Sequence, residues 1–303
     1  METAKSISLI VCTRNRAMAL PDCLATITAA AEGALAILSE VILVDNGSSD
    51  NTLALLRNWA RLQKFNVVVI EELKPGLANA RNTGFRQALG EIIACTDDDC
   101  HIAKDYFSSL QNAFSRHSGV LILGGRIELG DERDLPITIK LGDEIKELGP
   151  RTMPSGFIMG ANLAMHRKIF DIVGPFDERF GAGAKFRSAE DTDYFVRARA
   201  LGITVRYDPE PMVFHFHGRR EFEDAKKLYS GYSFGDGALF AKHFIADASV
   251  RHHLISNLYW GLRDIFRRKS SLDPLLGRKN LFKLKWNFIG FLFFVRESIG
   301  SDK

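Results

Sequence analysis

The sequence predicts an α/β protein whose mostly parallel sheet is flanked by helices, with a helical region appended at its C-terminal end. Short runs rich in valine and isoleucine alternate with helical patterns of roughly 10 to 15 residues in the first half, an arrangement typical of βαβ units. Polar clusters directly follow three of these apolar runs, and parallel sheets bind ligands at the carboxyl ends of their strands. After His217 the pattern is helical to the end, with an interruption near 270–274.

The first half is expected to contain four strand–helix units. Each strand is a short apolar run, and each helix repeats apolar residues every three or four positions. Asp50 precedes the second helix and is a typical N-cap residue. The expected strands are 7–12, 41–44, 67–70 and 91–95, and the expected helices are 17–32, 52–64, 77–89 and about 104–116.

The second half is less regular. Residues 130–154 are charged, with scattered proline and glycine, which predicts a loop or an insertion. The glycine-rich stretch 174–189 predicts a second, flexible loop. Strands are expected at 157–161 and 204–207, and helices at 167–173 and 190–201.

The charge of the chain is unevenly distributed. Its net charge is +3, but residues 219–303 carry 16 Lys/Arg against 9 Asp/Glu, whereas residues 1–218 carry 24 against 28. A basic tail behind a mildly acidic body favours an anionic partner surface, although a solvated basic helix face has the same composition. No recognised nucleic-acid-binding motif accompanies the tail, so nucleic acid is not expected as a partner.

Cysteine usage and the absence of a leader-like segment predict a reduced, cytoplasmic protein. The four cysteines form no CxxC pair, and Cys12 and Cys95 end apolar runs, which is typical of buried free thiols. No basic region followed by an apolar stretch opens the sequence. The most apolar segment, 286–295, is shorter than the roughly 18 residues of a membrane span.

An acidic triplet, Asp97-Asp98-Asp99, follows the fourth predicted strand directly. Adjacent carboxylates repel one another, and alternate residues of an extended chain point the same way, so Asp97 and Asp99 are placed to face one ligand. Hard oxygen ligands suit Mg²⁺ or Mn²⁺, which commonly bridge carboxylates to a diphosphate. The alternative is an acidic turn that caps the following helix.

Two further polar clusters follow the first and second predicted strands. Thr13-Arg14-Asn15 comes after the first, and Asp45 opens a turn after the second. An acid at that position can accept hydrogen bonds from a ribose or a base. The GxGxxG phosphate loop is missing after the first strand, which argues against a nicotinamide or flavin cofactor.

Four other residues allow both a chemical and a structural interpretation. Arg81 lies one turn into a predicted helix, where its guanidinium can meet a diphosphate or form a surface ion pair. A predicted helix begins with three acids, Glu190, Asp191 and Asp193. The helix dipole stabilises acidic side chains at this end, and at most one of the three is expected to act as a general base.

His215 and His217 flank Phe216 after a predicted strand, so both histidines are expected on one side of it. Either can ligate a metal ion or phosphate, with His215 the better candidate, or both can be polar residues of a solvated face.

Together these segments resemble the inverting glycosyltransferases of family 2, which have the GT-A fold with a Rossmann-like sheet. The resemblance covers roughly residues 6–217. The segments that carry it, in family order, are SLIVCTRNR, EVILVDNGSSDNT, PGLANARNTGFRQALGEIIACTDDD, GANLAMHR, VGPFDERFGAG and AEDTDYFVRARALG. The ordered set is specific, although each segment alone is weak.

The resemblance implies a role for each matched position. On the donor side it places the nucleotide against the polar strand ends and a divalent cation, Mg²⁺ or Mn²⁺, on a DxD motif. The implied nucleotide-binding residues are Thr13, Arg14, Asn15, Asp45, Arg81, Asp97 and Asp98; the implied metal ligands are Asp99, Asp97 and His215, with Asp99 the likeliest direct one.

On the acceptor side, Asp191 is the second residue of the family's Glu-Asp motif and corresponds to the catalytic base. Gly160, Ala161, Asn162 and Glu190 are implied to lie beside the donor sugar and the acceptor.

The resemblance also implies a domain organisation. Residues 1–218 form the GT-A catalytic domain, with nucleotide binding at about 1–125 and acceptor binding at about 126–218. Residues 219–303 form a helical region that matches no membrane-spanning pattern of processive synthases, which favours transfer of a single sugar. The donor is expected to be a nucleoside-diphosphate sugar, most commonly a UDP-sugar, and the acceptor a hydroxyl group, including that of a lipid-linked saccharide.

The last predicted helix has an interfacial pattern. Phe282, Trp286, Ile289 and Phe293 recur at helical spacing beside three lysines in 279–296. Such a helix suits contact with the inner face of a membrane, whereas packing on the catalytic domain or in a homodimer requires the same pattern.

Two other functions remain open from the sequence. A metal-dependent nucleotidyltransferase also uses an α/β sheet and carboxylates, but usually has a glycine-rich basic loop after its first strand, which Thr13-Arg14-Asn15-Arg16 only partly matches. A non-catalytic sugar-nucleotide-binding relative is the second alternative, although every expected acid is present.

Overall fold

The computed structural model describes residues 5–267 and 272–300. In the described residues one mixed sheet runs in the order β3-β2-β1-β4-β8-β6-β9-β5, with β7 paired to β9. The strands are β1 (Ile7–Thr13), β2 (Leu38–Asp45), β3 (Val67–Glu71), β4 (Ile92–Asp97), β5 (Cys100–Ile102), β6 (Leu121–Leu129), β7 (Lys146–Glu147), β8 (Asn162–His166) and β9 (Thr204–His215). The helices are α1 (Leu20–Glu32), α2 (Thr52–Arg61), α3 (Leu77–Gln87), α4 (Tyr106–Ser115), α5 (Lys168–Val173), α6 (Glu190–Ala200), α7 (Phe222–His243), α8 (Ala248–Arg263), the 3₁₀ turn η1 (Asp264–Phe266) and α9 (Lys279–Gly300).

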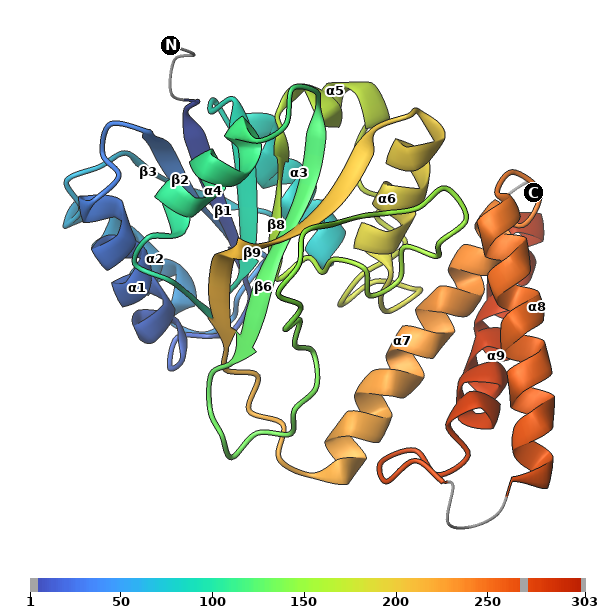
Figure 1. Ribbon diagram of the computed structural model, residues 1–303. Coiled ribbons are helices and arrows are strands. Elements are labelled where there is room, and N and C mark those ends of the chain that lie inside the picture. Colours follow the sequence, from blue (N-terminus) through green and yellow to red (C-terminus); the bar gives the residue numbers. More distant parts are fainter. Residues whose placement is uncertain (1–4, 268–271, 301–303) are drawn as a thin grey trace.

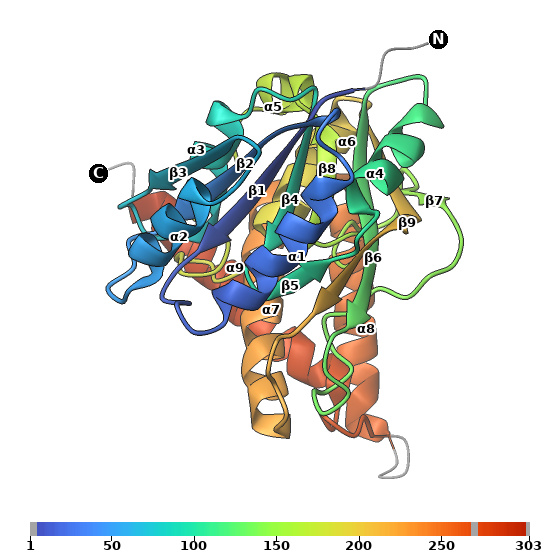
Figure 2. The ribbon, with the colours of Figure 1, turned by 90° about the vertical axis from the view of Figure 1, so that its left-hand side faces the viewer.

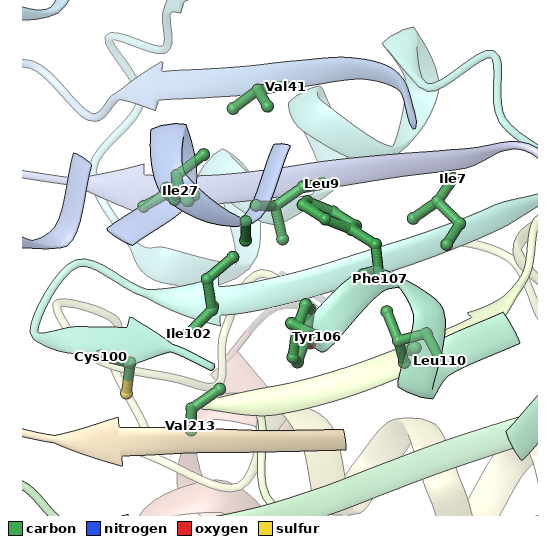
Figure 3. Packing of buried hydrophobic residues seen from close by; sticks show 14 of the residues in the cluster. Ile7, Leu9, Ile27, Val41, Cys100, Ile102, Tyr106, Phe107, Leu110 and Val213 are labelled. Carbon is green, nitrogen blue, oxygen red and sulfur yellow. The ribbon is translucent and has the colours of Figure 1, made fainter. Parts of the chain in front are cut away.

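Two helical layers cover the sheet, as Figures 1 and 2 show. Helices α1, α2 and α4 pack on one face, and α3, α5 and α6 on the other. Strand β1 supplies both layers because its side chains alternate: Leu9 and Val11 face α1, whereas Ile10 and Cys12 face α3. Figure 3 shows the first of these cores, where Ile27 of α1 meets Leu9.

The four strand–helix units expected in the first half are confirmed. Strands β3, β2, β1 and β4 pair in parallel, whereas β8 joins β4 in the antiparallel sense. The second half differs from expectation: β5 and β6 are additional strands, β7 lies inside the loop expected at 130–154, and β9 is longer than 204–207.

The strand expected at 157–161 is wrong, because β8 begins only at Asn162. Phe157 and Asn162 donate backbone N–H groups to Pro154 and Met159, so the segment turns instead of extending. It is apolar because Ile158 is buried in the second core.

The helices after β9 pack against the glycine-rich loop and α6 through a third core. Phe180 and Phe186 of the glycine-rich loop contact Phe294 of α9, and Phe234 of α7 contacts Phe293. Helices α7 and α9 cross with their backbones in contact: a Cβ on Gly237 or on Gly290 would overlap the main chain of the other helix. Figure 1 shows the three long helices side by side, next to the loop that precedes α6.

The C-terminal helix combines packing and exposure. Of the apolar stripe expected to be interfacial, Trp286 and Phe293 pack against the third core. Ile289 of that stripe is exposed, and so are Phe288, Leu292, Val295 and Ile299. In the described chain, no helix combines the length and the apolarity needed to cross a bilayer.

Candidate active site

A pocket of about 760 Å³ opens at the carboxyl ends of β1 and β4 and extends to α6 and α7. It brings together residues that lie more than 200 positions apart in the sequence. Of the predicted site residues, Thr13, Arg14, Arg81, Asp97, Asp98, Asp99, Gly160, Ala161, Glu190, Asp191 and His215 line it, whereas Asn15, Asp45 and Asn162 do not.

The acidic triplet lies in the tight turn between β4 and β5. Asp98 accepts a hydrogen bond from the Thr13 hydroxyl at 2.6 Å, and the Arg16 guanidinium lies 3.3 Å from Asp98 and 3.1 Å from Asp99. Burial raises the pKa of Asp98 to about 6, against the hydrogen bond from Thr13 and the charge of Arg16. Burial likewise raises the pKa of Asp97, with a contribution from the neighbouring charge of Asp99. A cation bound between these carboxylates would offset that repulsion.

His215 lies against Asp99 because β5 pairs with the end of β9. Cys100 and His215 are register partners, and the His215 Nε2 atom is 3.3 Å from an Asp99 oxygen. The Nδ1 atom lies 3.2 Å from the Thr138 carbonyl oxygen, which orients the ring. Although burial opposes it, the hydrogen bond with Asp99 raises the pKa of His215, and the same contact holds the pKa of Asp99 below its usual value.

One ligand atom each from Asp99, Cys100 and His215 lie within 4.8 Å of one another. Burial raises the pKa of the Cys100 thiol, so this sulfur stays protonated and is a poor ligand for a hard cation. The carboxylate and the imidazole are therefore the better ligands.

His217 has no comparable access to the pocket. Its Nε2 atom is 3.1 Å from the Leu135 carbonyl oxygen, and its Nδ1 atom accepts the Arg219 backbone N–H. Both ring nitrogens are therefore occupied by the main chain, which leaves His215 as the candidate ligand.

Arg81 is almost fully buried, at 1% exposure, and joins the two halves of the site. Its guanidinium lies 2.7 Å from Glu190 on α6 and 3.1 Å from Asp97 on β4. Burial and the charge of Asp191 raise the pKa of Glu190 to about 7, against the charge of Arg81. Because the guanidinium is buried and binds two carboxylates, we infer that Arg81 holds both acids in place and does not form a surface ion pair.

The three acids at the start of α6 point in three directions. Glu190 turns to Arg81, and Asp193 is fully buried between Arg197, Lys242 and His243. The hydrogen bond to His243 and the charge of Lys242 hold the pKa of Asp193 down despite its burial. Asp191 alone lines the pocket without an ion pair among the described residues, which fits the expectation of at most one base.

The backbone before Asp191 is held in an uncommon conformation. Arg187 and Ala189 have φ values of 66° and 71°, in the left-handed region that side chains rarely adopt. Gly160 donates its N–H to Asp191 at 3.0 Å, and this bond fixes the carboxylate in the pocket. Strained residues of this kind cluster at functional sites.

Three predicted residues lie outside the pocket lining. Asn15 and Asn162 are engaged in the fold: Asn15 accepts the Ser49 N–H, and Asn162 donates to the carbonyl oxygens of Arg126 and Pro211.

Asp45 is different, because only one of its carboxylate oxygens is satisfied. One oxygen accepts the Ser48 N–H at 3.0 Å, whereas the other is buried without a partner among the described residues. An unpaired buried acceptor is costly, and a ligand donor such as a ribose hydroxyl or a base N–H would satisfy it.

Several lining residues were not among the predicted site residues. They come from the loop before α6, from the segment between β9 and α7, or from α7 and α9, and none belongs to a family motif: Arg187, Arg219, Tyr232, Asp236 and Lys283. The sequence signal that relates to those of the C-terminal region is the basic composition of residues 219–303.

Comparison with known proteins places this geometry in a family. The family described as glycosyl transferase family 2 matches residues 8–174, more than half of the chain. The glycosyltransferase AglE of Haloferax volcanii is 24% identical over 233 residues, which cover 74% of this chain and 71% of AglE.

Two solved structures share the fold. The mannosyltransferase PcManGT from Pyrobaculum calidifontis, in complex with GDP-Man and Mn²⁺, has a TM-score of 0.63 at 17% identity, covering 97% of this chain and 88% of that one. TarS of S. aureus has a TM-score of 0.58 at 17% identity, covering 88% of this chain. This chain spans only 44% of TarS.

Proposed function

The chain belongs to glycosyl transferase family 2 and is a glycosyltransferase with the GT-A fold, and from that premise we propose a specific reaction. It transfers a sugar from a nucleoside-diphosphate sugar to an acceptor hydroxyl group, with inversion and with a divalent cation, in polysaccharide or glycolipid synthesis. One observation carries the proposal: the acidic triplet Asp97–Asp99 and Asp191 line a single pocket, although they lie on opposite sides of β8 in the sequence.

The donor binds at the carboxyl ends of β1 and β2. Asp45 lies just outside the pocket lining as the register partner of Thr13, and its unpaired oxygen would accept from the nucleoside. Thr13 and Arg14 line the pocket itself. Arg14 has no ion-pair partner among the described residues, so its charge is available to the diphosphate. A UDP-sugar is the expected donor.

Asp99 and His215 would hold Mg²⁺ or Mn²⁺, with Asp97 beside them. The cation supplies charge neutralisation for the departing nucleoside diphosphate. The carboxylate and imidazole donor set fits such an ion, and PcManGT, a structural neighbour, is solved with Mn²⁺.

Asp191 acts as the general base. Its carboxylate takes the proton of the acceptor hydroxyl while that oxygen attacks the anomeric carbon, and the bond to the diphosphate breaks on the opposite face. Direct displacement inverts the anomeric configuration and needs no covalent intermediate. The Gly160 N–H holds the carboxylate, and Arg81 fixes the neighbouring Glu190 so that it does not compete for the proton.

The variant Asp191→Asn tests this assignment. Asparagine can still accept the Gly160 N–H but cannot take a proton, so turnover is expected to fall about 100-fold or more. A thermal-shift titration with nucleotide sugars and Mn²⁺ measures donor binding, which should change little. Near-normal turnover would remove Asp191 from the role, and release of pyrophosphate from a nucleoside triphosphate plus a sugar phosphate would favour a nucleotidyltransferase instead.

We further propose that α8 and α9 contact an anionic membrane surface. Helix α9 exposes the stripe of Phe288, Leu292, Val295 and Ile299 and packs against α8. Tyr259 and Leu262 are exposed on α8, and Phe266 is exposed on η1. The sequence from 244 to 300 carries 10 Lys/Arg against 4 Asp/Glu. Exposed apolar side chains on a segment with an excess of basic residues suit anionic lipid, whereas two copies of this basic segment would repel each other.

Co-sedimentation with vesicles of anionic or zwitterionic lipid tests this contact. Leu292→Glu should lower binding to anionic vesicles severalfold, whereas Leu62→Glu, an exposed leucine on α2's C-terminal end, should not. Unchanged sedimentation of Leu292→Glu, or equal binding to zwitterionic vesicles, would contradict the contact.

A further inference from the structure

One wall of the active-site pocket comes from the C-terminal helices. The lining residues of α7 fall between 228 and 236 and recur every three or four positions, so one face of this part of the helix borders the pocket. Lys283 of α9 joins them. The α7 residues are Leu228, Tyr229, Tyr232, Ser233 and Asp236.

This wall is tied to the loop that carries the proposed base. The Ser188 hydroxyl donates to the Gly231 carbonyl oxygen at 3.1 Å, and a Cβ on Gly235 would overlap Ser188. Ser188 precedes Asp191 by three residues, so α7 sits directly against the start of α6. Asp191 and the lining residues of α7 therefore border one pocket, and a hydroxyl group that gives its proton to Asp191 binds in the space that α7 helps to enclose.

Two cations on this side of the pocket have no carboxylate partner. Lys283 is half-buried, and no carboxylate oxygen lies within 4.0 Å of its ammonium among the described residues. Arg187 stacks over the Phe234 ring at 4.4 Å but likewise forms no ion pair there. Burial lowers the pKa of Lys283, which shows that its positive charge is poorly solvated.

On the donor side of the pocket two arginines are paired with acids, whereas Arg14 is unpaired among the described residues and is assigned above to the diphosphate. There Arg16 is paired with Asp98 and Asp99, and Arg81 with Asp97 and Glu190. Arg219, which forms no ion pair with the described residues, lies between the two sides, since its charge acts to lower the pKa of Asp99 and also that of Tyr232 on α7.

Asp236 belongs to the wall. It accepts the Ser155 hydroxyl at 3.2 Å and lies close enough to Lys283 and Asp191 for their charges to act on it. Its carboxylate is thus available to a sugar hydroxyl while the ammonium nearby is free for an anion.

We propose that α7 and α9 form the acceptor subsite, and that the acceptor is a saccharide that carries an anionic group, phosphate or carboxylate, near the attacking hydroxyl. Lys283 and Arg187 bind the anion, and Asp236 and Tyr232 bind neighbouring sugar hydroxyls. The assignment rests on the proposed function, because it takes Asp191 as the group that receives the proton.

Calorimetric titration of the full chain tests the subsite directly. The nucleotide site is first filled with Mn²⁺ and the nucleoside diphosphate that stabilises the protein most. Glucose, galactose, mannose and N-acetylglucosamine are then compared with their 1-phosphates, and the three hexoses also with their uronic acids. We expect at least one anionic sugar to bind ten times more tightly than its neutral counterpart; the phosphate and carboxylate arms identify which anion is recognised.

Matched variants on one helix complete the test. Lys283→Gln should abolish the tenfold preference, whereas Lys285→Gln, an exposed lysine of α9, should keep it. Equal binding of neutral and anionic sugars, no second-site binding, or a preference that survives Lys283→Gln would each overturn the subsite. Mn²⁺-dependent binding of the donor is measured in the same samples. If the donor binds but the acceptor test fails, only the subsite is overturned and the proposed function stands. If the unmodified chain does not bind the donor, the proposed function itself is refuted.

Discussion

Replacing Arg81 by methionine would leave two acids of the active site without their shared counter-charge. The guanidinium is 1% exposed and contacts Glu190 at 2.7 Å and Asp97 at 3.1 Å. Methionine fills much of the same volume but cannot pair with a carboxylate. Removing one partner of a buried pair typically costs about 3–5 kcal/mol, because a charge stays buried without compensation.

This cost translates into a measurable melting shift. An unfolding entropy of about 2.1 cal/mol/K per residue gives about 0.6 kcal/mol/K for a chain of 303 residues, so Arg81→Met should lower Tm by about 5–8 °C. Arg81 acts to lower the pKa of Glu190, which is about 7 in its presence, so the pKa rises further in the variant. The loss should therefore shrink as pH falls towards about 7, because Glu190 of the variant becomes protonated and no longer needs a counter-charge.

A double-mutant cycle checks the mechanism. Glu190→Gln removes one of the two charges, so Arg81→Met should cost about 0.5–3 kcal/mol less in that background than in the unmodified chain. Tm is followed by differential scanning fluorimetry, and free energies by urea unfolding. A Tm within 1 °C of the unmodified protein, or additive effects of the two substitutions, would refute the coupling of these residues.

Two further predictions concern stability away from the pocket. Gly290→Ala should displace α9 from α7 and lower Tm by several degrees, because the new Cβ overlaps the Phe234 carbonyl oxygen. The control is Gly231→Ala on α7, whose new Cβ meets nothing within 4 Å. Equal melting temperatures of the two variants would contradict the close crossing of the helices. Burial lowers the pKa of His166 to about 4, so the unfolded chain binds its proton first and stability should fall as pH drops from about 6.5 to 4. His166→Asn, which can still accept the Leu121 N–H, should lose less stability over that range in urea titrations; parallel pH profiles would contradict this.

The parallel half of the sheet was predictable because its strands are apolar on both faces and are separated by periodic helices. The antiparallel half was not. β6 contains Gly124-Gly125 and alternates less clearly, and β5 has only three residues, too few for a periodic signal. The apolar run 157–161 was misassigned because burial in a turn and burial in a strand select the same side chains.

The candidate site divides along the same line. Residues at strand ends, such as Asp97–Asp99, were placed by topology alone, because carboxyl ends of parallel strands meet at one edge. The proximity of His215 to Asp99 depends on the β5–β9 pairing, and the role of α7 on a helix packing that no local pattern encodes. From the sequence Arg81 was expected either to meet a diphosphate or to form a surface ion pair, whereas its burial between two acids appears only in three dimensions.

The close crossing of α7 and α9 at two glycines makes these two helices one rigid structural unit. With no side chains interposed at Gly237 and Gly290, neither helix can slide by a turn without a clash, so Lys283 keeps a constant offset from Asp236. A chimaera that takes its C-terminal helices from a related enzyme should therefore exchange α7 and α9 together. Exchanging only one of them should misalign the side chains of α7 and α9 that line the proposed acceptor subsite.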